Sequence, residues 1–216
     1  MRYDLVIFDL DGTLLDTLGD LRNAANHALA NADAAPRTRE EVRAAIGDGL
    51  KMLLSRVLPA DASDAEIERA LQDFKDHYGE HMTAETKPYP GILPMLERLR
   101  DAGIAIAVHS NKYDAAVQSL CMEFFPNLYF RAVGESAQTP KKPDPAGTNA
   151  ILAVSGHDRA RTLFVGDSAV DLQTAKNAGV DAAWVSWGFR TRAEMGDIGN
   201  APTFDRADAL LEYLLN

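Results

Sequence analysis

Segments typical of buried strands alternate with segments typical of helices along most of this chain, and this alternation constrains the fold more than any other feature. Five segments are short, apolar and rich in β-branched or aromatic residues, as buried strands are. They are residues 3–8, 104–110, 129–135, 162–167 and 182–187. Strands that alternate with helices predict an α/β fold with a doubly wound parallel sheet.

Three of the intervening helices have ends that the sequence marks clearly. One ends at Gly103, a second begins with Pro145 and ends at Gly156, and a third ends at Gly179. Glycine is common just after a helix, and proline fits the first helical turn. These signals place a helix between successive strands.

Residues 17–83 interrupt this alternation. They contain no convincing strand but several helical patterns, one of which opens with Ser63 and Glu66 at the spacing of a capping box. A segment rich in proline and glycine follows at residues 86–91. We therefore expect a core formed by residues 1–16 and 87–216, with residues 17–86 as a small inserted α-helical domain.

The charge of the chain argues against nucleic acid as a partner. The sequence of 216 residues carries a net charge of -10, and its longest basic run is Lys141–Lys142. Binding to a nucleic-acid backbone needs clustered lysine and arginine. A small anionic ligand stays possible, because it needs only a local positive site.

The single cysteine, Cys121, cannot form an intramolecular disulfide and lies in an apolar segment. This favours a reducing, cytoplasmic setting. Asp9 and Asp11 interrupt the apolar run that a signal peptide would need, and no segment reaches the length of a membrane span. We therefore expect no membrane partner.

The segment VIFDLDGTLLD, residues 6–16, runs from a buried strand directly into carboxylates. In an extended chain, residues two positions apart project to the same side, so Asp9 and Asp11 are expected to face one site while Leu10 points away. Gly12 then permits a tight turn. Two carboxylates this close repel each other, and a bound cation is the usual way to keep both charged.

Other polar residues follow the predicted strands at the same edge of the sheet. Open parallel sheets bind ligands outside the carboxyl ends of their strands. The residues expected there are Asp9, Asp11, Ser110, Asn111, Lys142, Asp167 and Asp171. Because the acidic donors are hard oxygen ligands, the sequence predicts Mg²⁺ rather than zinc.

Each of these motifs also has a purely structural interpretation. Asp9 and Asp11 could belong to a polar turn, although not to an EF-hand loop, which needs glycine where Leu14 stands. Ser110 or Asn111, and likewise Asp167 or Ser168, could cap a following helix, and Lys142 could be a solvated loop residue. Only their common position at the strand ends favours a site.

The four motifs DLDGT, HSN, KKPDP and GDSAVD, in this order, resemble those of the haloacid dehalogenase-like phosphatases over essentially the whole chain. The resemblance implies a Rossmann-like core and a phosphatase that works through an aspartyl-phosphate. It makes Asp9 the nucleophile and Asp11 the general acid and base. Ser110 and Lys142 become the phosphate-binding pair, with Lys142 preferred over Lys141 because it directly precedes a proline.

The same resemblance implies metal and substrate ligands. The expected Mg²⁺ ligands are Asp9, Asp11, Asp167 and Asp171. The expected substrate-binding residues are Gly12, Thr13, Asn111, Arg43 and Gly47.

Within that family, residues 42–50 and 88–92 resemble phosphoglycolate phosphatases, in which a small helical cap is expected to select a small phosphate ester. Gly47 and Gly49 could present free amides of a helix end to a second anionic group of the substrate, or could simply form the turn of a helix hairpin. Arg43 could supply a cation there or be solvated. The oligomeric state is expected to be monomer or homodimer.

Several other functions compete with this one. His77 and His81 match the H-x-x-E-H pattern of inverted zinc peptidases, although Gly79 weakens that helix. A phospho-acceptor signalling domain shares the sheet, the aspartyl-phosphate and the lysine, but not the inserted helices. A sugar phosphomutase or a pyrophosphatase of the same family is also possible.

Overall fold

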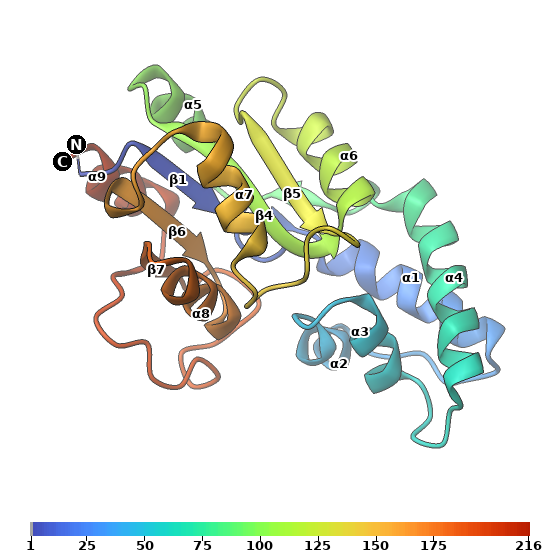
Figure 1. The fold of residues 1–216 in the computed structure, drawn as a ribbon. Coiled ribbons are helices and arrows are strands. Elements are labelled where there is room, and N and C mark those ends of the chain that lie inside the picture. The colour runs from blue at the N-terminus through green and yellow to red at the C-terminus, as the bar shows by residue number, and fades with distance from the viewer. Residues whose placement is uncertain (1) are drawn as a thin grey trace. The chain divides into compact units, whose positions relative to one another are not determined.

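The computed structural model of the chain describes residues 2–216 and divides into two compact units (Figure 1). One unit runs to Leu15 and resumes over Pro88–Asn216, and the other is Asp16–Lys87. The sequence places these boundaries one residue away, at 16/17 and 86/87. That the second unit acts as a cap stays a prediction.

Among the described residues, six strands form one parallel sheet in the order β5-β4-β1-β6-β7-β8. They are β1 (Leu5–Phe8), β4 (Ala105–Tyr113), β5 (Arg131–Glu135), β6 (Thr162–Gly166), β7 (Asp181–Val185) and β8 (Thr203–Phe204). The predicted doubly wound α/β fold is confirmed, and five of these strands are those that the sequence predicts.

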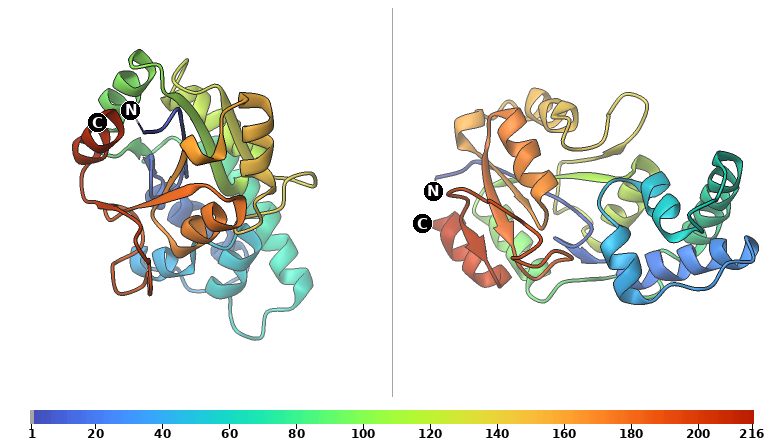
Figure 2. Two further views of the ribbon diagram at one scale, coloured as in Figure 1. Left: turned by 60° about the vertical axis from the view of Figure 1, so that its left-hand side comes forward. Right: turned by 90° about the horizontal axis from the view of Figure 1, so that it is seen from below.

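Helices cover both faces of this sheet (Figures 1 and 2). They are α5 (Ile92–Asp101), α6 (Asp114–Phe124), α7 (Ala146–Ser155), α8 (Ala169–Ala178) and α9 (Ala207–Leu215), with a short 3-10 turn at Arg159–Arg161. α7 packs against α8 on one face, and α5 packs against α9 on the other. Ile7, Phe164 and Ile151 belong to the fully buried core between the sheet and α7 and α8.

The register of the central strands explains why polar residues gather at one edge. Phe8, the last residue of β1, pairs with Val108 of β4 and Val165 of β6. The residues that follow these three positions therefore emerge side by side at the carboxyl ends of the strands. This is where ligands bind in open parallel sheets.

The second unit is helical. It contains α1 (Leu18–Asn31), α2 (Arg39–Ala45), α3 (Leu50–Val57) and α4 (Asp64–His81). The predicted capping box is present, because the side chain of Ser63 accepts from the amide of Glu66 and Glu66 accepts from the amide of Ser63. The short strands β2 (Leu15–Asp16) and β3 (Lys87–Pro88) pair where the chain passes between the units.

Across residues 2–216, no helix combines the length and the apolar composition that a membrane crossing requires.

Candidate active site

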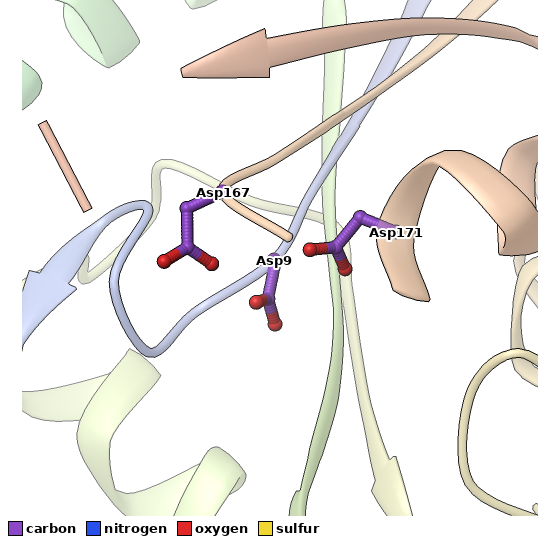
Figure 3. Close-up of side chains that lie close together, drawn as sticks. All are labelled: Asp9, Asp167 and Asp171. Atoms are coloured by element: carbon purple, nitrogen blue, oxygen red, sulfur yellow. The ribbon is translucent and has the colours of Figure 1, made fainter. Parts of the chain in front are cut away.

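Three buried carboxylates lie together at the carboxyl end of the sheet. Asp9, Asp167 and Asp171 each offer an oxygen, and these oxygens all lie within 4.8 Å of one another. The three residues are 7%, 3% and 0% exposed. In Figure 3, Asp9 follows β1, Asp167 follows β6 and Asp171 lies at the start of α8, with the three carboxyl groups close together. Strand ends far apart in the sequence thus form one acidic cluster, as the sequence predicts.

Local contacts fix the two later carboxylates. One oxygen of Asp167, Oδ2, accepts a 2.6 Å hydrogen bond from the amide of Phe189, and its backbone carbonyl accepts from Trp184 Nε1 at 2.9 Å. Asp171 Oδ2 accepts from the amide and the hydroxyl of Ser168, at 3.0 and 2.6 Å. The capping role that the sequence allows for Ser168 therefore coexists with the place of Asp171 in the cluster.

Lys142 neutralises part of this cluster. Its Nζ lies 2.8 Å from Asp9 Oδ1 and 2.6 Å from Asp171 Oδ1, and its side chain is only 3% exposed. Asn111 holds the loop that carries it: Asn111 Oδ1 accepts from the amide of Lys142 at 2.6 Å, and Asn111 Nδ2 donates to its carbonyl at 3.2 Å. Lys142 is thus buried among the carboxylates, whereas Lys141 is exposed. Substrate binding by Asn111 stays a prediction.

Burial and crowding shift the pKa values of the cluster. Burial, reinforced by Asp171 and Asp11, raises the pKa of Asp9 to about 7, although Lys142 acts in the opposite direction. Burial, together with the charges of Asp171 and Asp9, raises the pKa of Asp167 well above its ordinary value. Burial disfavours the charged form of Lys142, but Asp171 and Asp9 outweigh it and raise its pKa.

The cluster fits a divalent cation. Asp9, Asp167 and Asp171 together with Asp11 supply four carboxylates, while Lys142 and Lys112 supply two ammonium groups, which leaves two negative charges when all are ionised. Burial first, and then the neighbouring carboxylates, raise the pKa values of Asp9 and Asp167. Hard carboxylate oxygens are the donors that Mg²⁺ and Ca²⁺ prefer, and sulfur or imidazole donors are absent from this group. Because Asp171 already accepts from Lys142 and Ser168, Asp9 and Asp167 have the more available oxygens.

Asp11 lies beside the group of three carboxylates, and its place among the metal ligands stays a prediction. Its carboxylate is not in the group of three, and Asp11 Oδ1 lies 3.1 Å from Lys112 Nζ. The prediction assumed an extended chain, but β1 ends at Phe8 and the segment then turns, so that Asp11 bridges to Leu15. Asp11 still lies close enough to Asp9 to raise its pKa. It is therefore beside the cluster, with a cation of its own.

Gly12, Thr13 and Ser110 border the same region. Gly12 has a φ of 85°, and a Cβ there would lie 2.4 Å from Asp167 Oδ2, so only glycine fits this turn. The hydroxyl of Thr13 is buried without a hydrogen-bond partner among the described residues. Ser110 is 2% exposed, and its Oγ accepts from the amide of Lys112 at 3.2 Å. Their roles toward a substrate stay predictions.

The remaining predicted residues belong to the helical unit. Arg43, in α2, pairs with Glu40 at 2.7 Å. Gly47 lies between α2 and α3 with a φ of 126°. Substrate binding by Arg43 and Gly47 stays a prediction.

The histidines that suggest a peptidase form no such site. The rings of His77 and His81 stack with their centroids 4.4 Å apart. Among residues 2–216, the acidic cluster is the one group of three or more candidate metal-ligating side chains.

Three site residues are absent from the sequence-based prediction. Lys112 directly follows the HSN motif, but it lies beyond the predicted strand 104–110, where a lysine is usually solvated, so the sequence does not identify it. Trp184 and Phe189 hold Asp167 through hydrogen bonds from an indole and a backbone amide. No sequence motif predicts these two contacts.

Known proteins share this fold and much of this sequence. The family model described as haloacid dehalogenase-like hydrolase matches residues 6–185. A phosphoglycolate phosphatase of Mesorhizobium japonicum is 34% identical over 89% of this chain and 86% of its own length. Another, of Cereibacter sphaeroides, is 36% identical over 97% of this chain and 96% of its own.

Solved structures agree with these matches. A provisionally named phosphoglycolate phosphatase of Lactobacillus delbrueckii subsp. bulgaricus has a TM-score of 0.92 at 34% identity, covering 99% of both chains. The protein CbbY of Rhodobacter sphaeroides, solved in complex with phosphate, has a TM-score of 0.77 at 26% identity, covering 96% of both. With four motifs in order, a buried acidic cluster at the ends of β1 and β6, and relatives aligned over nearly its whole length, this chain is an enzyme that belongs to the haloacid dehalogenase-like hydrolases.

Proposed function

We propose that this enzyme is a Mg²⁺-dependent phosphatase that hydrolyses a small anionic phosphate monoester, of the phosphoglycolate type, through an aspartyl-phosphate at Asp9. The observation that carries the proposal is the buried group of Asp9, Asp167 and Asp171 joined by Lys142. It combines a carboxylate nucleophile, oxygen ligands for a cation and an ammonium group for a phosphoryl oxygen. The names of the relatives and the phosphate held by CbbY support the substrate class.

The first chemical step forms a bond between a carboxylate oxygen of Asp9 and phosphorus. The bond from phosphorus to the ester oxygen breaks, and Asp11 donates a proton to that departing oxygen. Asp9 and Asp167 would hold the divalent cation, which would supply positive charge to offset the repulsion between the anionic nucleophile and the anionic ester. Lys142 and Ser110 orient the remaining phosphoryl oxygens.

The second step regenerates the enzyme. Asp11, now a carboxylate, accepts a proton from a water molecule whose oxygen attacks phosphorus. The bond between Asp9 and phosphorus breaks, and inorganic phosphate leaves. The two steps return both aspartates to their starting states, and the net reaction is hydrolysis of one ester.

The substrate's second anionic group is proposed to be recognised by Arg43 and the amides beside Gly47 in the helical unit. The site of action is proposed to be the cytoplasm, which agrees with a buried free thiol at Cys121.

Phosphate release from a panel of small phosphate monoesters tests this proposal. The panel contains 2-phosphoglycolate, glucose 1-phosphate and p-nitrophenyl phosphate, with pyrophosphate added as a rival substrate, and is assayed with Mg²⁺ and with a chelator. The expected result is Mg²⁺-dependent release that is fastest with 2-phosphoglycolate and lost in Asp9→Asn. Faster isomerisation of glucose 1-phosphate, or faster cleavage of pyrophosphate, would replace the proposal with a phosphomutase or a pyrophosphatase. A single labelling of the protein without turnover would indicate a signalling domain.

A further inference from the structure

Lys112 is a buried cation that lies outside the group of Asp9, Asp167, Asp171 and Lys142. It stands near the end of β4, and in its ion pair with Asp11 the two side chains are 5% and 15% exposed. The surface pair Lys51–Glu68, in comparison, has both side chains 55% exposed. Burying an ammonium group costs several kcal/mol of solvation, and an apolar side chain often serves packing equally well. The buried position of this charge therefore calls for a reason other than stability.

Three consecutive residues near the end of β4 are linked to one another and to two other segments of the site. Ser110 Oγ accepts from the amide of Lys112 at 3.2 Å. The side chain of Asn111 accepts a hydrogen bond from the amide of Lys142 and donates one to its carbonyl. Lys112 Nζ reaches Asp11 at 3.1 Å. This segment therefore sets the positions of a hydroxyl, a lysine and a carboxylate relative to one another.

Asp11 needs an attractive partner in this position. It follows Asp9 by two residues, in a turning segment in which Asp11 bridges to Leu15. Two carboxylates this close in the sequence repel each other, and rotation of the more exposed one, Asp11, toward water would relieve that repulsion. The ammonium group of Lys112 opposes that rotation and holds Asp11 beside the nucleophile.

We propose that Lys112 is a positioning residue, which holds the carboxyl group of Asp11 where it delivers a proton to the departing ester oxygen. The inference rests on the proposed phosphatase function and deepens it. Lys112 itself takes no proton and forms no covalent bond in this account. Its removal should therefore slow most the reactions whose departing oxygen needs a proton.

Two aryl phosphates with the same charge and different leaving groups provide the test. Phenolate is a poor leaving group that needs protonation, whereas p-nitrophenolate departs without it. Because general acid catalysis contributes about 100-fold or more, we expect Lys112→Met to lower kcat/KM about 100-fold on phenyl phosphate and less than about 5-fold on p-nitrophenyl phosphate. Lys112→Arg should recover most of the loss.

Lys112→Gln is a second variant, for use if the apolar replacement does not fold, and thermal unfolding of each variant checks the fold. Lys176→Met, an exposed lysine of α8, is the matched control and should leave both substrates unaffected. Equal losses on the two esters would overturn the inference and assign Lys112 to phosphate binding or to structure. No loss on either ester would overturn it as well.

A double variant separates action through Asp11 from direct action on the substrate. If Lys112 acts through Asp11, adding Lys112→Met to Asp11→Asn should cost less than about 2-fold further on phenyl phosphate, because coupled residues are not additive. If the loss in the double variant equals the product of the losses in the two single variants, the inference is contradicted. Failure of the phosphatase function itself would appear differently, as wild-type protein that releases phosphate from neither ester.

Discussion

Asp9 shares one lysine with Asp171 and lies against a third carboxylate, so its negative charge is poorly compensated before a cation binds. Asparagine has nearly the same shape and lacks this charge. We therefore expect Asp9→Asn to fold as the wild type does, with a melting temperature that is not lower, and to lose at least about 10⁴-fold in kcat. Steady-state phosphate release and thermal unfolding measure the two effects.

Asp101→Asn is a suitable control for this variant. Asp101 ends α5 and pairs with its exposed neighbour Arg100 at 2.8 Å. Its replacement should leave kcat unchanged, since the pair lies on the surface. Activity of Asp9→Asn within about 100-fold of the wild type would argue against Asp9 as the nucleophile.

His109 gives the protein a specific sensitivity to acid. The imidazole is 1% exposed, and its Nδ1 lies 3.1 Å from Thr148 Oγ1. Burial, together with the charge of Lys142, lowers the pKa of His109 to about 3, from an ordinary value of 6.5. Between these values the unfolded chain binds a proton that the native state does not, so the native state loses stability as the pH falls through this range.

His109→Gln removes this titration. Relative to the variant, the wild-type free energy of unfolding should decrease by up to about 1 kcal/mol for each pH unit below about 6.5. Urea unfolding of both proteins at about pH 7.5, 6 and 5 measures the difference. A difference that stays constant over these conditions would mean that the histidine titrates normally in the native state.

Single residues differ in how far the sequence predicts them. Asp9 and Asp167 are predictable because each directly follows an apolar strand, where a buried charge has no structural purpose of its own. Lys112 is not recognised in this way, because a lysine beside a strand end is usually solvated. Only the folded chain brings it to Asp11.

At the scale of elements, the turn after β1 depends on Gly12. A left-handed φ and the contact with Asp167 coincide at this residue. Gly12→Ala should displace Asp167, lower kcat/KM by about 100-fold and destabilise the fold by about 1–2 kcal/mol. Kinetics at several Mg²⁺ concentrations and urea unfolding measure these effects.

Gly103→Ala is the matched control for the turn. Gly103 has a similar φ of 79°, but a Cβ there would meet no atom within 4 Å. Gly103→Ala should therefore lower the free energy of unfolding about as much as Gly12→Ala does, and should leave kcat/KM unchanged. If both alanine variants kept full activity, the contact between Gly12 and Asp167 would have no part in the reaction.

Elements with strong sequence signals are predictable, and short ones are not. α7 and α8 end at Gly156 and Gly179 as expected, each in the left-handed conformation. β2, β3 and β8 are two residues long, too short for any periodicity. α9 is absent from the prediction although its buried residues Ala207, Leu210 and Leu214 recur at helical spacing, so this signal was available.

At the scale of the whole molecule, the acidic cluster should couple metal binding to stability. A ligand that binds only the native state stabilises it by about 2.7 kcal/mol at a hundredfold excess over its Kd. We expect Mg²⁺ at that concentration to raise the melting temperature by about 5–10 °C relative to protein in a chelator. Calorimetric or fluorescence melting curves measure this shift.

Asp167→Asn should abolish most of this increase, because Asp167 is one of the two more available ligands. If the melting temperature is the same with Mg²⁺ and with chelator, the native protein does not bind Mg²⁺ at this cluster, whatever its activity.

The topology explains why motifs far apart in the sequence can be assigned to one site from the order of strands and helices alone. β4 and β6 both pair in parallel with β1, so residues after Phe8, Val108 and Val165 must emerge together. Side-chain rotamers and the turn at Asp11 follow from packing rather than from strand order. The place of Asp11 beside the group of three carboxylates is accordingly a detail that strand order does not predict.

The central claim, that Asp9 carries the phosphoryl group, is tested most directly by trapping the intermediate. Borohydride reduces an aspartyl-phosphate to homoserine, so enzyme quenched with acid during turnover can be reduced and analysed by peptide mass spectrometry. The account predicts homoserine at position 9 in the wild type and none in Asp9→Asn or without substrate. Homoserine at Asp11, Asp167 or Asp171 with position 9 unmodified, or turnover that leaves every aspartate unmodified, would contradict it.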